Sequence, residues 1–219
     1  NFYRKYLFNI KKWSSTETVL EKGQKKKDFN NDSVLIRFKI QLDKFNINTK
    51  STLTPNFKWA AVNVDNIINQ YFSKKFILLF PFCSPQLQHK KWPYFNKLIR
   101  IIKSKHENLE IVIAPGPDEL EEAKSINSVV ITKNNKPINI MELAGLILKS
   151  SYVISNDTGP AHMAAHLGKE GTVLFGYHTS PQKVSIETEK FKSLVVKDLK
   201  DLSPESVYSS IKEKLELIN

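Results

Sequence analysis

Short apolar runs alternate with stretches at helical spacing from residue 75 to the end of the chain. Apolar runs bounded by turn residues predict buried strands, and apolar residues three and four positions apart predict helices. The predicted strands are 76–82, 110–114, 129–132, 152–154, 172–175 and 194–197. The predicted helices are 93–105, 117–125 and three that begin after Asn139, at Pro160 and at Pro204. This alternation predicts an α/β fold with a parallel sheet covered by helices on both faces.

One predicted helix has a clear start signal. Asn139 followed by Glu142 has the spacing of a capping box, in which each side chain bonds the other residue's backbone N–H. Ile140, Leu143 and Ile147 follow at helical spacing, and we expect them on the buried side of this helix.

The first 72 residues have a different pattern. Asp32 is a candidate helix cap, and Leu35, Phe38 and Leu42 follow at helical spacing, which predicts a helix that runs to residue 45. A second helix is predicted over 64–72, and little sheet is predicted. The sequence does not begin with Met, and we expect it to be a piece of a longer protein. We therefore divide it into 1–72, the remnant of an amino-terminal domain, and 73–219, a Rossmann-like domain.

The charge of the chain is strongly positive. It has 33 Lys and Arg against 22 Asp and Glu, a net charge of +11. Such an excess attracts nucleic acid, an anionic membrane surface or a phosphorylated substrate. The lysines are dispersed apart from Lys25-Lys26-Lys27, without an RNA-binding signature, so we do not expect nucleic acid as a partner. Apolar runs stay well short of the roughly 20 residues that span a bilayer, and a single cysteine excludes an internal disulfide.

The segment 155–168 carries the most specific chemistry. It joins two apolar runs, with Pro160 suited to a first helical turn and Gly168 suited to a helix end. Such a turn directs the free N–H groups and positive dipole of a helix beyond the carboxyl end of the sheet, where an anion can bind. The polar residues at this point are Asp157, Thr158 and His162. The segment therefore indicates a site for a phosphorylated ligand.

Four loops are expected at the same edge. In an open parallel sheet, ligands bind outside the carboxyl ends of the strands. The loops predicted there are 83–92, 115–119, 156–162 and 176–181. They carry hydroxyls, lysines, carboxylates and histidines, including His178, and this combination suits a nucleotide.

These loops also carry a family resemblance. The residues concerned are Phe80-Pro81, Lys90-Lys91-Trp92-Pro93, Pro115-Gly116, Asn156-Asp157-Thr158-Gly159-Pro160-Ala161-His162 and Leu174-Phe175-Gly176. In them, residues 76–181 resemble the carboxyl-terminal half of glycosyltransferase family 9, which includes the ADP-heptose:lipopolysaccharide heptosyltransferases. The resemblance implies a GT-B architecture, two Rossmann-like domains that face a cleft. Residues 73–219 would be the nucleotide-sugar-binding domain, and the amino-terminal, acceptor-side domain would be incomplete.

The resemblance implies a set of donor contacts. They are Ser84, Lys90, Glu119, Asp157, Thr158, Gly159 and His162. Lys90 and Ser84 would lie at the phosphates, the residues of the 156–162 turn would contact the diphosphate and the sugar, and Glu119 is the candidate for the ribose or the base. The implied donor is a nucleotide diphosphate sugar, with ADP-heptose as one candidate. No cofactor and no metal are expected, because lysine and helix N–H groups can offset the charge that grows on a departing diphosphate.

The implied reaction is transfer of a sugar, with heptose as one candidate, to a lipopolysaccharide-core or related glycan. The expected location is the cytoplasm, with peripheral contact at the inner membrane surface. Family members have a glycine-rich loop with an acceptor-activating Asp near the start of the first domain, which this sequence does not contain; Asp28, Asp32 and Asp43 lie in the wrong context. Two interpretations therefore stay open: a glycosyltransferase, and a non-catalytic nucleotide-binding GT-B half or inactive fragment.

Simpler interpretations of single residues also stay open. Asp157 could only cap the helix that follows it, and Lys90 could be a solvated charge. His162 and His166 have a spacing that can bind zinc on a helix, although no third ligand is evident in the sequence.

Overall fold

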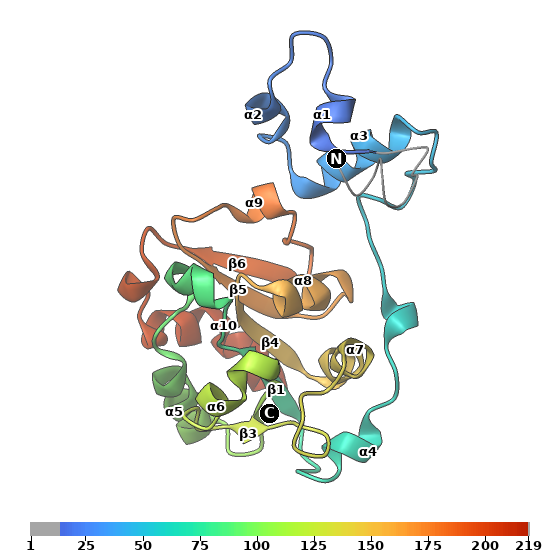
Figure 1. Cartoon of the computed structure of the whole chain (residues 1–219). Coiled ribbons are helices and arrows are strands. Elements are labelled where there is room, and N and C mark those ends of the chain that lie inside the picture. The colour runs from blue at the N-terminus through green and yellow to red at the C-terminus, as the bar shows by residue number, and fades with distance from the viewer. Residues whose placement is uncertain (1–13, 219) are drawn as a thin grey trace. The chain divides into compact units, whose positions relative to one another are not determined.

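The computed structural model describes residues 14–218 (Figure 1). By internal contacts the chain divides into two compact units. The smaller ends at Pro55 and includes Gln182–Ser185, and the larger comprises Asn56–Pro181 and the chain from Ile186 onward.

The smaller unit is helical in its described part. Its helices are α1 (Thr16–Val19), α2 (Lys26–Phe29) and α3 (Val34–Asp43). The helix predicted from Asp32 is confirmed, although its N-cap is Ser33. Within the described residues, α3 buries no side chain completely, and Phe38 is 52% exposed.

The larger unit is built on one parallel sheet of six strands in the order β3-β2-β1-β4-β5-β6. The strands are β1 (Phe76–Phe80), β2 (Glu110–Ile113), β3 (Val129–Val130), β4 (Tyr152–Asn156), β5 (Gly171–Phe175) and β6 (Phe191–Val195). The predicted α/β fold is thus confirmed. Every residue of β1, β4 and β5 is buried, as expected for strands with helices on both faces.

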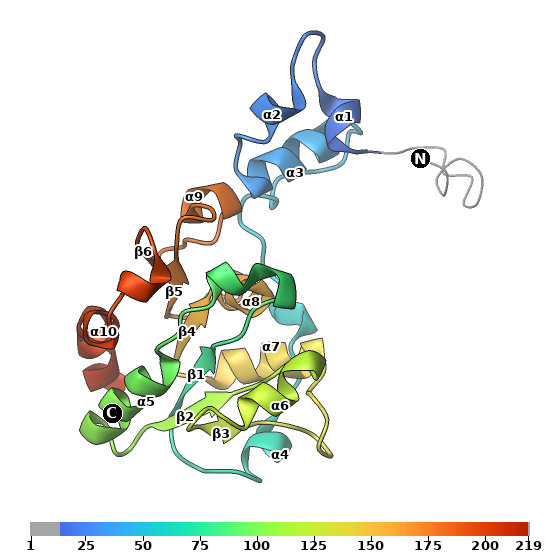
Figure 2. The same ribbon diagram turned by 60° about the vertical axis from the view of Figure 1, so that its left-hand side comes forward.

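Helices cover both faces of this sheet (Figure 2). On one face α5 (Phe95–Lys105) packs against α10 (Pro204–Ile218), and both belong to a core that includes Ile77, Ile111 and Ile154. On the other face α7 (Ile140–Lys149) packs against α8 (Gly159–His166). The remaining helices are α4 (Asp65–Ile68), α6 (Leu120–Ala123), α9 (Pro181–Val184), and the 3-10 turns η2 (Lys58–Ala60), η3 (Pro85–Lys90), η4 (Pro117–Glu119) and η5 (Leu199–Asp201).

Several predicted helix details were wrong. The helix over 64–72 shortens to α4, and 117–125 divides into η4 and α6. The capping box at Asn139 is present, and Ile147 is buried, but Ile140 is 70% exposed. The first turn of α7 lies at the carboxyl edge of the sheet, so its first side chain has little to pack on.

Residues 56–72 lie with the sheet unit. The Val62 N–H donates to the Met141 carbonyl at 3.3 Å, and a Cβ added at Gly145 would clash with the Val62 carbonyl. Close packing of this segment on α7 therefore requires glycine there. The assignment of 1–72 to an amino-terminal functional domain stays a prediction. Along the chain, the first segment of the smaller compact unit ends at Pro55, and the larger unit begins at Asn56.

Candidate functional site

The carboxyl ends of β1 and β4 lie side by side at the point where the strand order changes direction. Phe80 is paired with Ser155 in the last rung of the β1–β4 ladder. After β1 the chain continues to β2 on one side, and after β4 it continues to β5 on the other. In an open parallel sheet, this arrangement leaves a crevice between the two loops.

Asn156 joins these loops. Its Nδ2 donates to the carbonyls of Pro81 and Phe82 at 2.8 and 3.3 Å, and its Oδ1 accepts from the Trp92 N–H at 3.0 Å. The side chain is fully buried, so all three bonds are shielded from water. Asn156 therefore fixes the loop after β1 and, through Trp92, the position of Lys90.

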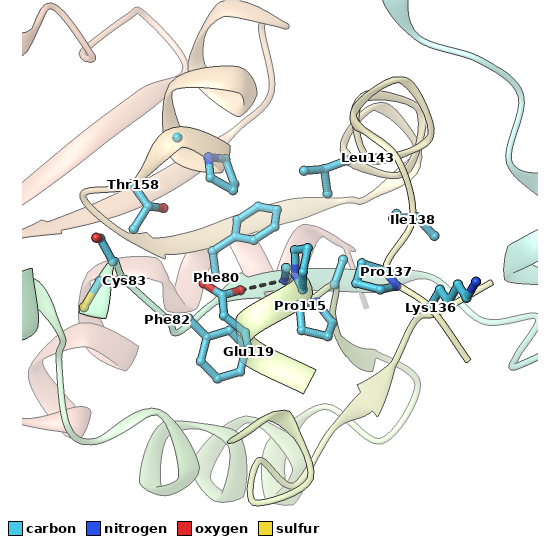
Figure 3. A pocket seen from close by; sticks show the side chains of 16 residues that line it. Phe80, Phe82, Cys83, Pro115, Glu119, Lys136, Pro137, Ile138, Leu143 and Thr158 are labelled. Atoms are coloured by element: carbon cyan, nitrogen blue, oxygen red, sulfur yellow. Dashed lines mark hydrogen bonds between the residues drawn. The ribbon is translucent and has the colours of Figure 1, made fainter. Parts of the chain in front are cut away.

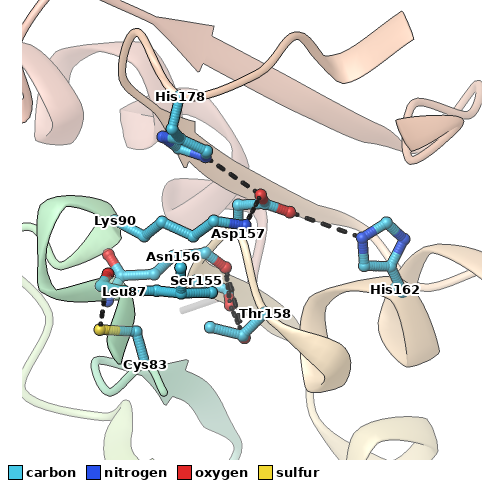
Figure 4. A network of polar contacts seen from close by, with 9 residues as sticks. All are labelled: Cys83, Leu87, Lys90, Ser155, Asn156, Asp157, Thr158, His162 and His178. Atoms are coloured by element: carbon cyan, nitrogen blue, oxygen red, sulfur yellow. Dashed lines mark hydrogen bonds and ion pairs between the residues drawn. The ribbon is translucent and has the colours of Figure 1, made fainter. Parts of the chain in front are cut away.

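Asp157 is the centre of a polar network next to this bond cluster (Figure 4). Its Oδ2 accepts from Lys90 Nζ at 2.7 Å and from His178 Nε2 at 3.0 Å, and its Oδ1 lies 3.5 Å from His162 Nε2. The Asp157 side chain is only 3% exposed. The structure thus brings together three of the predicted donor contacts, Lys90, Asp157 and His162, and adds His178.

The charge of Asp157 follows from these contacts. Burial alone would raise its pKa, but hydrogen bonds from His162 and Lys90, the charge of Lys90 and the bond from His178 together hold the pKa well below the usual value of 3.8. The carboxylate is therefore ionised at neutral pH, and Lys90 is its counter-ion.

This shift predicts a pH dependence of stability. Because the folded-state pKa of Asp157 lies below its unfolded value, its stabilising contribution is fully present above that unfolded value and is lost as the pH falls through the folded pKa. We expect the free energy of unfolding of the wild type to fall more steeply from about pH 4 to pH 2 than that of Asp157→Asn.

Urea unfolding at a series of pH values measures this difference. The matched control is Asp118→Asn in the exposed turn η4, which should keep the wild-type slope. Equal slopes for Asp157→Asn and the wild type would contradict the prediction.

A cavity of about 600 Å³ lies beside the network (Figure 3). Its walls come from the loops after β1 and β2, the segment 136–138, and the first turn of α8. The apolar side chains that line it include Phe80, Phe82, Pro115, Pro117, Pro137, Ile138, Leu143 and Pro160. Four predicted donor contacts also line it: Ser84, Glu119, Thr158 and Gly159. The cavity is of a size and polarity suited to a small organic ligand.

Glu119 and Ser84 have different surroundings in this wall. Glu119 Oε2 accepts from the Gly116 N–H at 2.7 Å. Burial raises the pKa of Glu119, and the bond from Gly116 opposes this only in part. Ser84 Oγ is exposed and donates to Gln86 Oε1 at 2.7 Å.

The amino end of α8 forms part of the same wall. Its N-cap is Thr158, whose side chain makes no capping bond. The Asp157 side chain instead bonds Lys90 and His178, so the interpretation of Asp157 as only a helix cap is wrong. A Cβ added at Gly159 would meet nothing within 4 Å. Gly168 has a φ of +75°, as predicted for the helix end. The positive end of α8 therefore faces open space at the cavity.

Three further observations concern metal-type clusters, membrane-spanning helices and Cys83. Within residues 14–218, no group of three or more His, Cys, Asp or Glu is arranged to hold a metal ion. No helix of that part of the chain is both long and apolar enough to cross a membrane. Cys83 is buried, its Sγ donates to the Leu87 carbonyl, and burial raises the pKa of its thiol, in agreement with a core residue.

Sequence reasoning missed the roles of Asn156 and His178. Both stood in segments already singled out, 155–168 and 176–181. The available signal was that both residues stand at or just after the carboxyl end of a strand. That position does not specify which side-chain atoms form hydrogen bonds with each other.

A model of Glycosyltransferase family 9 (heptosyltransferase) matches residues 20–211. Over 128 residues the chain is 31% identical to the lipopolysaccharide core heptosyltransferase OpsX of Haemophilus influenzae, covering 56% of this chain and 35% of that protein.

Two solved structures have a similar fold. The E. coli heptosyltransferase WaaC with ADP has a TM-score of 0.60 at 16% identity, and the match covers 81% of this chain and 55% of the WaaC chain. The E. coli ADP-heptose LPS heptosyltransferase II has a TM-score of 0.58 at 18% identity, and the match covers 69% of this chain and 50% of the heptosyltransferase II chain. The chain thus spans about half the length of these structures, and the likeness shows the fold.

Proposed function

The chain belongs to glycosyltransferase family 9, and from this we propose that it binds a nucleotide diphosphate sugar and transfers the sugar to a lipopolysaccharide-core or related glycan. The observation that carries the proposal is Lys90, held by the buried Asp157 beside the open amino end of α8. ADP-heptose is the first candidate donor, because WaaC was solved with ADP and OpsX is a lipopolysaccharide core heptosyltransferase.

The diphosphate would lie between Lys90 and the first turn of α8. The Lys90 ammonium and the helix N–H groups would offset negative charge that grows on the diphosphate as the bond to the sugar breaks. His162 lies in the same turn, with its Nε2 near Asp157 Oδ1. This arrangement supplies positive charge where the reaction requires it.

The nucleoside would occupy the 600 Å³ cavity. Its apolar walls can cover the faces of a base, and Glu119 offers a carboxylate for ribose hydroxyls. Gly116 already engages one carboxylate oxygen of Glu119 and holds the side chain in place. Ser84 stands at the phosphate end of the same wall.

In the reaction, an acceptor hydroxyl oxygen attacks the anomeric carbon of the sugar, the bond from that carbon to the diphosphate oxygen breaks, and a base removes the hydroxyl proton. We assign no residue of this chain to the base. The net charge of +11 supports an acidic glycolipid as acceptor, met at the cytoplasmic side of the inner membrane. A nucleotide-binding half without transfer activity would share the same site and differ only in a transfer assay.

Titration calorimetry with ADP, GDP and UDP tests donor binding. We expect saturable binding, tightest for ADP, and competition between ADP and the intact nucleotide sugar. If the wild-type chain binds none of the three, the proposed function is wrong.

The Gly159→Ala substitution tests where the phosphates bind. Because a Cβ there meets no atom within 4 Å beyond its chain neighbours and its own helix backbone, we expect the free energy of unfolding to change by no more than about 0.5 kcal/mol. The added methyl group would stand where a phosphate approaches the helix N–H groups, so affinity for ADP should fall about tenfold or more. Urea unfolding and calorimetry measure the two effects.

The control lies at the other end of the same helix. Gly168→Ala places a side chain on a residue with φ of +75°, which should cost about 1 kcal/mol of stability and leave ADP affinity unchanged. Unchanged affinity in Gly159→Ala would contradict the proposed position of the diphosphate.

A further inference from the structure

His178 lies in the loop after β5 and is held firmly. Its ring stacks on that of Phe175, with centroids 5.6 Å apart and planes 15° from parallel. Its Nε2 lies 3.0 Å from Asp157 Oδ2, and the side chain is 3% exposed. His178 is not among the residues that line the cavity, so its contacts point to a role through Asp157.

The contact with Asp157 fixes the state of this imidazole. An ionised carboxylate only accepts hydrogen bonds, so Nε2 must carry the hydrogen. The charged or titratable groups that face His178 are Asp157, Lys90 and His89. Burial, together with the charge of Lys90, lowers the pKa of His178 more than Asp157 raises it. His178 is therefore a neutral donor at pH 7, and its buried Nδ1 has no hydrogen-bond partner in the described part of the chain.

Asp157 Oδ2 consequently has two donors of different kinds. Lys90 donates from the end of a flexible side chain that is 20% exposed, whereas His178 donates from a buried, stacked ring. A diphosphate at the amino end of α8 would compete with Asp157 for the Lys90 ammonium. A buried carboxylate oxygen that loses its partner is costly, but His178 keeps one bond to Oδ2 in place.

We propose that His178 is a positioning residue that holds Asp157 in place while Lys90 is shared with the donor diphosphate. The inference rests on the proposed function, since it assumes that a nucleoside diphosphate binds at Lys90. It assigns His178 no contact with the ligand.

Two variants of His178 separate the N–H from the ring. His178→Phe keeps an aromatic ring against Phe175 and removes the donor, whereas His178→Gln places an amide N–H near the position of Nε2. In calorimetry with ADP on the full chain, we expect His178→Phe to weaken binding about tenfold and His178→Gln to stay within about threefold of the wild type. If His178→Gln binds as weakly as His178→Phe, the inference is wrong.

A double-mutant cycle tests the route through Asp157. In an Asp157→Ala background, which removes the acceptor oxygen, His178→Phe should weaken ADP binding less than about twofold, because residues that act through one contact are not additive. A full tenfold loss in that background would show that the His178 N–H acts by a route other than Asp157, and would overturn the inference. If Asp157→Ala leaves no measurable binding, the comparison of His178→Phe with His178→Gln decides alone.

Failure of this inference and failure of the proposed function give different results. Wild-type affinity in His178→Phe overturns the inference and leaves the proposed function standing. An absence of ADP, GDP and UDP binding in the wild type overturns both. Urea unfolding of each variant establishes that a weak binder is folded.

Discussion

Replacement of Lys90 with Ala is expected to weaken nucleoside diphosphate binding about 100-fold, equivalent to about 2.7 kcal/mol. The ammonium is proposed to be the charge-assisted donor to the diphosphate, and bonds of this kind contribute about 1.5–3 kcal/mol each. The variant would also leave the buried Asp157 carboxylate without its cation. Removal of one partner of a buried pair costs about 3–5 kcal/mol. Because His162 and His178 remain beside Asp157 and Lys90 is partly exposed, we expect about 2 kcal/mol of lost stability.

The adjacent lysine provides the matched control. Lys91 pairs with Glu122 at the surface, with side chains that are 27% and 44% exposed. Lys91→Ala removes the same charge one position away, yet it should cost no more than about 0.5 kcal/mol of stability and leave ADP affinity unchanged. Calorimetry and urea unfolding of both variants decide the matter. Equal effects of the two substitutions would mean that Lys90 acts only through net charge.

The centre of the sheet was predictable from the sequence because β1, β4 and β5 are buried on both faces. Runs such as 76–80 and 152–154 are continuous apolar segments, and a strand between two helix layers requires this pattern. The carboxyl-end rule then located the site, since the loops after these strands meet at one edge whatever their detailed conformation. Capping signals were equally local, as at Asn139, where both bonds of the box form within four residues.

Features that depend on distant contacts could not be predicted. Helical spacing found α3, but it does not tell what covers a helix, and Phe38 is exposed. The family resemblance predicted that Asp157 and Lys90 contact the ligand, but it did not predict the ion pair between them. His178 joins the network only because β5 is hydrogen-bonded next to β4, and one sequence does not specify that register.

That register depends on a glycine. Gly171, the first residue of β5, is paired with Val153 on β4 and with Phe191 on β6. A Cβ added there would approach the Val153 carbonyl oxygen to 2.6 Å and clash with the Phe191 ring. The carbonyl belongs to the sheet and Phe191 is fully buried, so neither group can move aside without a large cost in free energy. We expect Gly171→Ala to lower the free energy of unfolding by about 3 kcal/mol, as overpacking of a core does.

The same substitution should reach the site. The β4–β5 ladder runs from Val153 and Gly171 to Asn156 and Leu174, so strands forced apart at its start would move Asp157 away from His178. We therefore expect weaker ADP binding in Gly171→Ala under conditions where it is still folded.

Urea unfolding measures the stability change. Addition of Phe191→Leu should recover part of the loss, because it removes the ring but not the carbonyl clash. Wild-type stability in Gly171→Ala would show that β5 is not packed between β4 and β6 as described, and the contact between His178 and Asp157 would lose its structural basis.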